Sequence, residues 1–119
     1  MELFDTTHLG LERALAGAAA RQSAIAGNLA NVSTPGYRRQ DLDFHGVLRN
    51  AFAEGGKDAL ERADLTPSAD PLAPMRLDGN SVDADVEAAE QARNGLEYEA
   101  LASVIKARDD VLRAAIGVA

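Results

Sequence analysis

The residues best suited to chemistry are four acids and one amide of the segment DGNSVDADVE, residues 78–87. Their side-chain oxygens are of the kind that calcium prefers, and they belong to Asp78, Asn80, Asp83, Asp85 and Glu87. An EF-hand loop needs an oxygen ligand at position five, Gly at six and Glu at twelve. Counted from Asp78, those positions hold Val82, Asp83 and Ala89. We therefore expect no metal or other cofactor, and we interpret the acids as helix caps and dipole partners.

Hydrolytic chemistry would require a nucleophile beside a positioned base. The only histidines are His8 and His45, and neither adjoins a Ser or Cys nucleophile motif. The chain has no Cys, which removes thiolate chemistry and disulfides and leaves the redox compartment open. We expect no catalytic residue and no enzyme.

Composition limits the remaining functions. A chain of 119 residues makes one domain at most, and 4% aromatic residues without Trp provide little bulk for a core. The net charge of -7 argues against nucleic acid as a partner, because that affinity depends on Lys and Arg. No run of about 18 apolar residues and no basic leader occurs, so neither membrane insertion nor a cleaved signal peptide is expected.

The elements that must position any site are helical. A seven-residue repeat of apolar or small residues, broken only at Gln22, predicts a helix over residues 6–32 with a seam like that of a coiled coil. The repeat comprises Leu11, Leu15, Ala18, Ile25, Leu29 and Val32. Asp5, Thr6 or Thr7 could cap its start. Its glycines Gly10, Gly17 and Gly27 either weaken the helix or allow another backbone to approach.

The middle of the chain, residues 41–82, is less regular. Asp41 to Ala53 is predicted as a short helix, and Gly55 to Pro74 as a mobile loop, because Gly, Pro and Asp are frequent there. Leu72 to Leu77 could form a short extended segment.

A second long helix is predicted over residues 83–117, with Ser81 or Asp83 as its cap. Its apolar positions at helical spacing are Val86, Ala89, Leu96, Ala100, Leu101, Val104, Ile105, Val111, Leu112, Ala115 and Ile116. The fold class is therefore all-α: one domain, 1–119, with two long antiparallel helices in a coiled-coil-like hairpin. Because two helices cover only one side of each other, apolar surface should remain uncovered.

The segment Asn28 to Tyr37, NLANVSTPGY, ends the first helix. Pro35 and Gly36 suit the two central positions of a type II turn over residues 34–37, within the connection 33–40. Asn28 and Asn31 could cap free carbonyls or adopt the left-handed conformation that ends a helix.

The stretch AIAGNLANVSTPGYRRQDLDF, residues 24–44, resembles the N-terminal motif of the bacterial flagellar rod and hook axial proteins. LDGNSVDADVEAAEQARNGLEYEAL, residues 77–101, is similar to the matching C-terminal motif of the short proximal-rod members of that family. The motif residues are Asn28, Asn31, Thr34, Pro35, Gly36, Tyr37, Asp78, Gly79, Asn80, Val82, Asp83 and Glu87.

The resemblance implies a structural subunit needed for motility, which polymerises into the rod linking the membrane ring to the distal rod and hook. Its implied partners are copies of itself, other rod proteins, membrane-ring junction proteins and the flagellar type III export apparatus. Its implied location is the basal body, in the rod that crosses the periplasmic space. Alternatives are another short rod subunit, or a helical adaptor or chaperone-like module.

Two hypotheses concern contacts in such an assembly. Residues expected to pack within or between subunits are Leu11, Leu15, Ile25, Leu29, Val104, Ile105, Val111, Leu112 and Ile116. The Asn28 to Tyr37 turn is interpreted as an elbow that leads the chain to a neighbouring subunit, with Tyr37 as anchor and Arg38 and Arg39 as rim charges. The alternative is that Tyr37 packs within its own subunit.

Overall fold

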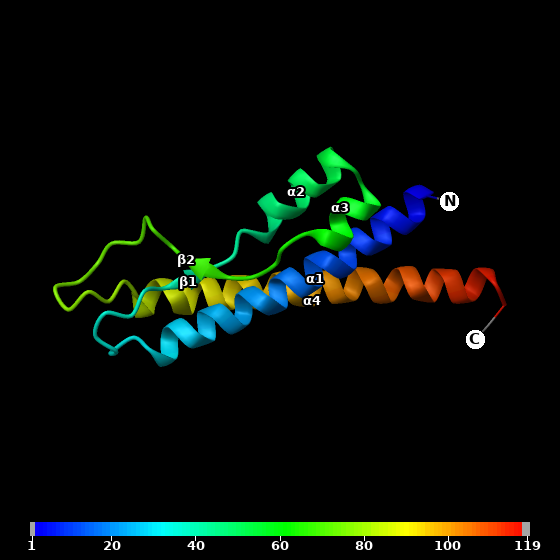
Figure 1. Cartoon of the computed structure of the whole chain (residues 1–119). Coiled ribbons are helices and arrows are strands. Elements are labelled where there is room, and N and C mark those ends of the chain that lie inside the picture. The colour runs from blue at the N-terminus through cyan, green and yellow to red at the C-terminus, as the bar shows by residue number, and fades with distance from the viewer. Residues whose placement is uncertain (1, 118–119) are drawn as a thin grey trace.

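Two long helices that cross in antiparallel directions dominate the protein (Figure 1). The computed structural model describes residues 2–117, with side chains from residue 6 onward. Helix α1 spans Glu2–Ala30 and helix α4 spans Ala84–Ala115. The molecule measures 61 × 32 × 14 Å, and the start of α1 and the end of α4 lie at the same end of it (Figure 1). The predicted all-α hairpin is confirmed.

The start of α4 confirms Asp83 as its cap. The side chain of Asp83 accepts hydrogen bonds from the backbone NH groups of Asp85, at 3.0 Å, and Val86, at 3.3 Å. The predicted start of α1 is wrong, because the helix already includes Glu2 and Thr6 and Thr7 lie inside it. No Gly or Pro precedes Thr6 to stop the helix from extending toward the N-terminus.

Two short helices and a two-stranded ladder connect α1 to α4. Helix α2 spans Phe44–Glu54 and helix α3 spans Lys57–Arg62. Strand β1, Gln40–Asp41, pairs antiparallel with strand β2, Ser68–Ala69. The predicted loop over 55–74 therefore contains a helix, and the extended segment lies at β2 rather than at 72–77. A helix of six residues is too short to show a periodic pattern, although its Leu60 is fully buried.

The apolar core lies where α2 and α3 pack on α1. It comprises Ala18, Leu42, Phe44, Leu48, Ala51 and Leu60. Gly17 admits the ring of Phe44, since a Cβ atom at residue 17 would lie 2.6 Å from the Phe44 Cβ. The glycines of α1 were predicted to weaken the helix or to admit another backbone. Gly17 and Gly10 instead allow the close approach of the side chains of Phe44 and Phe52.

Two glycine substitutions should have opposite effects on stability. Gly17→Ala should lower the free energy of unfolding by about 1–3 kcal/mol, because the added methyl group overlaps Phe44. Gly95→Ala should raise the free energy of unfolding by about 0.5–1 kcal/mol, because Gly95 lies inside α4 and no atom lies near the position that an added Cβ would take. Urea unfolding followed by circular dichroism measures both values. Equal effects of the two variants would contradict this account of the α1–α2 contact.

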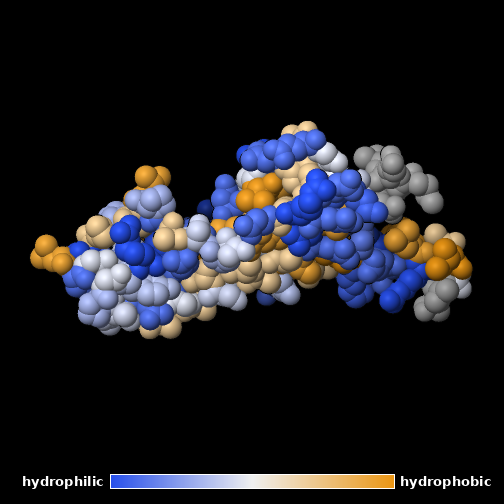
Figure 2. All heavy atoms as spheres, viewed as in Figure 1, coloured by the Kyte–Doolittle hydropathy of each residue, from blue (hydrophilic) through white to orange (hydrophobic). Residues whose placement is uncertain are grey.

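The apolar positions of α4 do not all face α1. The residues of α4 that are fully buried are Glu87 and Asn94, which lie one heptad apart on the side that contacts α1. An exposed row at helical spacing runs along another side, interrupted only by Arg93. We call this row the outer stripe; it consists of Val86, Ala89, Leu96, Ala100, Val104, Ala107 and Val111. Apolar surface is also visible near the C-terminal end of α4 (Figure 2).

None of the helices within residues 2–117 is both long enough and apolar enough to span a lipid bilayer.

Candidate functional site

The two sequence motifs meet as a pair of interlocked turns. In the first turn, the Tyr37 NH donates to the Thr34 carbonyl at 3.2 Å, and Gly36 has a φ of 76°, as the predicted type II turn requires. In the second, Gly79 has a φ of 81°. The Gly36 NH donates to the Asp78 carbonyl at 2.9 Å, and a Cβ atom on Gly79 would lie 3.4 Å from the Gly36 Cα. Both glycines are thus required by backbone conformation, and the turns are in direct contact.

Asn80 satisfies the backbone carbonyls at the end of α1. Its side chain is fully buried, and its amide nitrogen donates to the carbonyls of Asn31, Val32 and Thr34 at 2.9, 3.3 and 2.8 Å. Its amide oxygen accepts from the Val82 NH at 2.7 Å. The last carbonyls of a helix lack partners within the helix. Here a residue from the second motif supplies a partner for the carbonyls that follow α1.

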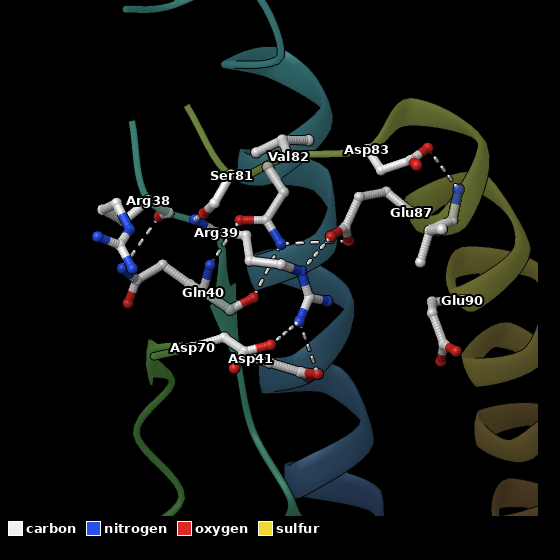
Figure 3. Close-up of polar contacts among 12 residues, drawn as sticks. Arg38, Arg39, Gln40, Asp41, Asp70, Ser81, Val82, Asp83, Glu87 and Glu90 are labelled. Atoms are coloured by element: carbon white, nitrogen blue, oxygen red, sulfur yellow. Dashed lines mark hydrogen bonds and ion pairs between the residues drawn. The ribbon is translucent and has the colours of Figure 1, made fainter. Parts of the chain in front are cut away.

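Asn28 and Glu87, which are fully buried, form a polar cluster with Arg39. Figure 3 shows the Arg39 side chain directed at Glu87. The fully buried Glu87 accepts from the Arg39 Nε at 2.5 Å and from the Asn28 Nδ2 at 3.2 Å. Asn28 also bonds both backbone groups of Gln40, accepting from its NH and donating to its carbonyl, each at 2.8 Å. We call Asn28, Arg39, Asn80 and Glu87 the clasp, because they connect the end of α1 to β1 and to the start of α4.

Ion pairs extend the clasp along α1 and α4. Arg39 also contacts Asp70 at 2.8 Å and Asp41 at 3.4 Å, while Arg21 bridges Asp41 at 2.9 Å and Glu90 at 2.8 Å. Burial alone would lower the pKa of Arg39, but its hydrogen bonds to Glu87 and Asp70 raise that pKa above the ordinary value. The hydrogen bond to Asp41 is the main cause that raises the pKa of Arg21. Both arginines are therefore held in their charged form.

Asp41 makes part of the stability depend on pH. Burial alone would raise its pKa, but the hydrogen bonds from Arg21 and the Leu42 NH, and the charge of Arg39, lower it below the ordinary value of about 3.9. A carboxylate whose pKa is depressed by folding stabilises the native state above the unfolded-state pKa, and this stabilisation is lost as the pH falls through the folded-state value.

We expect Asp41→Asn to be less stable than the parent protein at pH 7, with a difference that shrinks once the pH falls below about 4. Urea unfolding at pH 7, 5 and 3 measures this. Asp43→Asn is the matched control for removing one charge, because Asn preserves the cap that Asp43 provides at the start of α2. A constant difference between Asp41→Asn and the parent protein at all three pH values would refute the assignment.

A groove of about 680 Å³ lies beside the clasp, between α4 and the loop that precedes the second turn. Its lining includes Arg21, Arg39 and Glu87, together with apolar side chains such as Met75 and Val86. Among the described residues, its lining includes no Ser, Thr, Cys or His side chain, and Arg39 and Glu87 neutralise each other. Such an arrangement can hold segments of chain together through ion pairs and apolar contacts.

Known proteins resemble this chain over most of its length. Residues 11–38 match the family described as "Flagella basal body rod protein". The chain is 33% identical to the flagellar basal body rod protein FlgB of Escherichia coli, with 80% of this chain and 84% of that protein covered. It is 32% identical to FlgB of Bacillus subtilis, with 85% of each chain covered. It is 34% identical to FlgB of Cereibacter sphaeroides, with 81% and 82% covered.

The chain belongs to the FlgB family of flagellar basal body rod proteins. The family is structural rather than enzymatic, and its members are components of the flagellar basal body. The resemblance to flagellar axial proteins is therefore confirmed.

The structure brings most of the motif residues together. Asn31, Thr34 and Asn80 meet at the end of α1, and Gly36 contacts Gly79. Asn28 was predicted to cap the end of the helix, but its side chain instead bonds to Glu87 and to Gln40 of β1. Asn31 provides the cap, because its side-chain amide donates to the Gly27 carbonyl at 2.8 Å. Val82 is buried, whereas Pro35 is exposed.

The motif acids serve the fold in different ways. Asp78 accepts from the Asn80 NH at 3.0 Å, and Asp83 caps α4. Glu87 was interpreted as a partner of the helix dipole. It does lie in the first turn of α4, but it is buried against Arg39. Among the described residues, no group of three or more His, Cys, Asp or Glu side chains is arranged to hold a metal ion.

The prediction of Arg39 as a rim charge is wrong. Its side chain is 11% exposed and lies at the centre of the ion pairs, whereas Arg38 points away from Glu87 (Figure 3). The Tyr37 hydroxyl donates to the Asn28 Oδ1 at 3.4 Å. This contact agrees with the alternative that Tyr37 packs within its own subunit. A contact of Tyr37 with a neighbouring subunit stays a prediction.

Sequence reasoning also missed Arg21, Asp70 and Arg76. Arg76 donates from its guanidinium to the carbonyls of Val32 and Val82 and so joins the two turns. The only signal in the sequence was an arginine within a loop otherwise rich in Pro and Leu.

The predicted packing residues fall into two groups. Ile25 is fully buried, and Leu11, Leu15, Leu29 and Ile105 are half-buried. The others are exposed, and they are Val104, Val111, Leu112 and Ile116. Their packing between subunits stays a prediction.

Proposed function

We propose that the protein polymerises into the proximal rod of the bacterial flagellar basal body, and that the outer stripe of α4 is the surface through which neighbouring subunits pack. The observation that carries this proposal is that all seven residues of the stripe are exposed on one face of a single helix. Monomeric proteins rarely leave so long an apolar surface uncovered.

The spacing of the stripe favours another helix as the occupant. Its positions from Val86 to Val111 follow each other at three or four residues except where Arg93 stands between Ala89 and Leu96, and this is the spacing by which helices pack side by side. At 1.5 Å per residue the stripe would extend over roughly 38 Å. The alanines within it would let the backbone of a partner helix approach closely. Copies of this chain and other rod proteins are the proposed partners.

The remaining parts of the proposal rest on the family resemblance. The subunit links the membrane ring to the distal rod and hook, contacts the membrane-ring junction proteins, and lies in the rod that crosses the periplasmic space. It reaches that site through the flagellar type III export apparatus without a cleaved signal peptide. The clasp supports this role by holding the chain reversal after α1 in one conformation.

Charges placed on the outer stripe should block assembly without unfolding the subunit. Val104 and Val111 are 47% and 68% exposed, so Val104→Glu with Val111→Glu should preserve the helical circular dichroism spectrum of the monomer. Buried at a subunit interface, the unpaired carboxylates would be strongly unfavourable. We expect cells carrying the double variant to lack rods in electron micrographs of isolated basal bodies, and to lose motility.

The matched control is Ala88→Glu, which adds a carboxylate to an exposed position of α4 outside the stripe. It should leave rods and swimming unchanged. Normal rods in cells that express only the Val104→Glu and Val111→Glu variant would rule out the stripe as the packing surface.

A further inference from the structure

A polar pair interrupts the contact between the two long helices. Asn94 of α4 is fully buried, and its amide nitrogen donates to the Ala18 carbonyl at 2.9 Å and to the Gln22 Oε1 at 2.8 Å. Gln22 occupies the one position where the apolar seven-residue repeat of α1 is broken. The break in the repeat therefore has a specific partner on the opposite helix.

The pair of Asn94 and Gln22 is poorly suited to stabilising the contact between the two helices. The Asn94 Oδ1 is buried and has no hydrogen-bond partner among the described residues. Burial of an unpaired polar atom is unfavourable, and an apolar pair of similar volume would avoid that cost. The best-documented role of a polar pair between two packed helices is to set their register and to select the partner.

Helix α1 could pack on either of two faces of α4, and such a polar pair can determine which face it uses. Helix α4 carries a second face, the outer stripe, on which the apolar side of α1 could also pack. On that face, Gln22 would lie near Ala89 and Leu96, which offer no side-chain hydrogen bond, and Arg93 would be buried against a neutral amide. A slip of one heptad along the correct face would instead place Leu101 or Glu87 opposite Gln22, and in either direction Asn94 would lose both Gln22 and the Ala18 carbonyl. Each alternative leaves a buried amide without its partner.

We infer that Gln22 and Asn94 select both the face of α4 that binds α1 and the register of the two helices, which keeps the outer stripe uncovered. The selection operates while the single chain folds, so it does not depend on the proposed assembly into a rod. It predicts that apolar residues at these two positions stabilise the helices but relax their pairing.

Distance measurement between two spin labels tests the inference in the full chain. The protein has no Cys, so Ser23→Cys on α1 and Ala92→Cys on α4, both at exposed positions, provide the only labelling sites. Dilution with unlabelled protein separates distances within a chain from those between chains. A register slip of seven residues displaces one label along the helix by about 10 Å.

In the background of Gln22→Leu with Asn94→Leu, we expect a second, longer distance, because the slip moves one label along the helix past the other, or a dimer in sedimentation, with no loss of resistance to urea. The swapped variant, Gln22→Asn with Asn94→Gln, keeps two facing amides and should show the single parental distance. Ala88→Leu, which adds an apolar side chain to an exposed position of α4 away from the pair, should also leave the distance unchanged.

Three results would overturn the inference. The first is a double leucine variant that stays monomeric with the single parental distance. The second is loss of its helical circular dichroism, because the inference requires an apolar pair to pack there. The third is broadening of the distance in the swapped variant.

Discussion

Arg39→Ala is expected to lower the free energy of unfolding by about 3–5 kcal/mol, because it leaves the buried carboxylate of Glu87 without its cation. Glu87 has no exposed side-chain surface, so water cannot replace the lost guanidinium without opening the clasp. Domains of this size are stable by only about 5–15 kcal/mol in total. The variant should therefore be close to unfolding at room temperature, as urea titration followed by circular dichroism would show.

Two controls separate the buried pair from a general effect of charge. Arg38→Ala removes the neighbouring arginine, which makes no ion pair within the described part of the chain, and should change stability by less than about 1 kcal/mol. The double variant Arg39→Leu with Glu87→Leu removes both charges and should recover much of the loss, because no unpaired charge stays buried. If Arg39→Ala were no less stable than Arg38→Ala, the ion pair would contribute nothing to the fold.

Asn80→Asp is the second substitution with a large expected effect. It replaces a buried amide by a group of nearly the same shape, but the carboxylate cannot donate to the carbonyls of Asn31, Val32 and Thr34. The charge would instead lie against three oxygens that carry partial negative charge. We expect a loss of about 3 kcal/mol or more, since leaving one buried polar group unpaired already costs about 1–3 kcal/mol.

Hydrogen exchange adds a local measurement for Asn80→Asp. The NH groups of Tyr37 and Ser81, which bond across and between the two turns, should lose protection before those at the centre of α4. Asn50→Asp is the matched control, because Asn50 is exposed on α2 and should tolerate the same change. Uniform loss of protection along the chain would argue against a separate role for the turns.

Features that depend on neighbours in sequence could be predicted. The cap at Asp83 and the turn at Pro35 and Gly36 follow from local backbone chemistry, because a side chain or a positive φ acts within three or four residues. The long helices follow from periodicity for the same reason. The two motifs were recognised as a pair only through family resemblance, and their contact through Asn80 was not foreseen.

Features that depend on distant partners could not be predicted. Arg39 and Glu87 lie 48 residues apart, and an arginine after a turn is more often solvated than buried. The face of α4 that contacts α1 was also ambiguous, because the apolar stripe is the more obvious candidate for burial. The structure places the polar residues Glu87 and Asn94 there instead, each with a partner on α1.

The pairing of α1 with α4 also sets the order in which the chain can fold. The contacts of the clasp and the seam join residues separated by 59 positions, as in Asn28 with Glu87, and by 76, as in Ala18 with Asn94. Such high contact order makes folding slow, because the loop must close before any of these contacts forms. Until residues beyond Ala84 have left the ribosome, α1 can pack only on α2 and α3. The N-terminal two thirds of a growing chain therefore contains the residues of the apolar core, but it lacks the clasp and the α1–α4 contact.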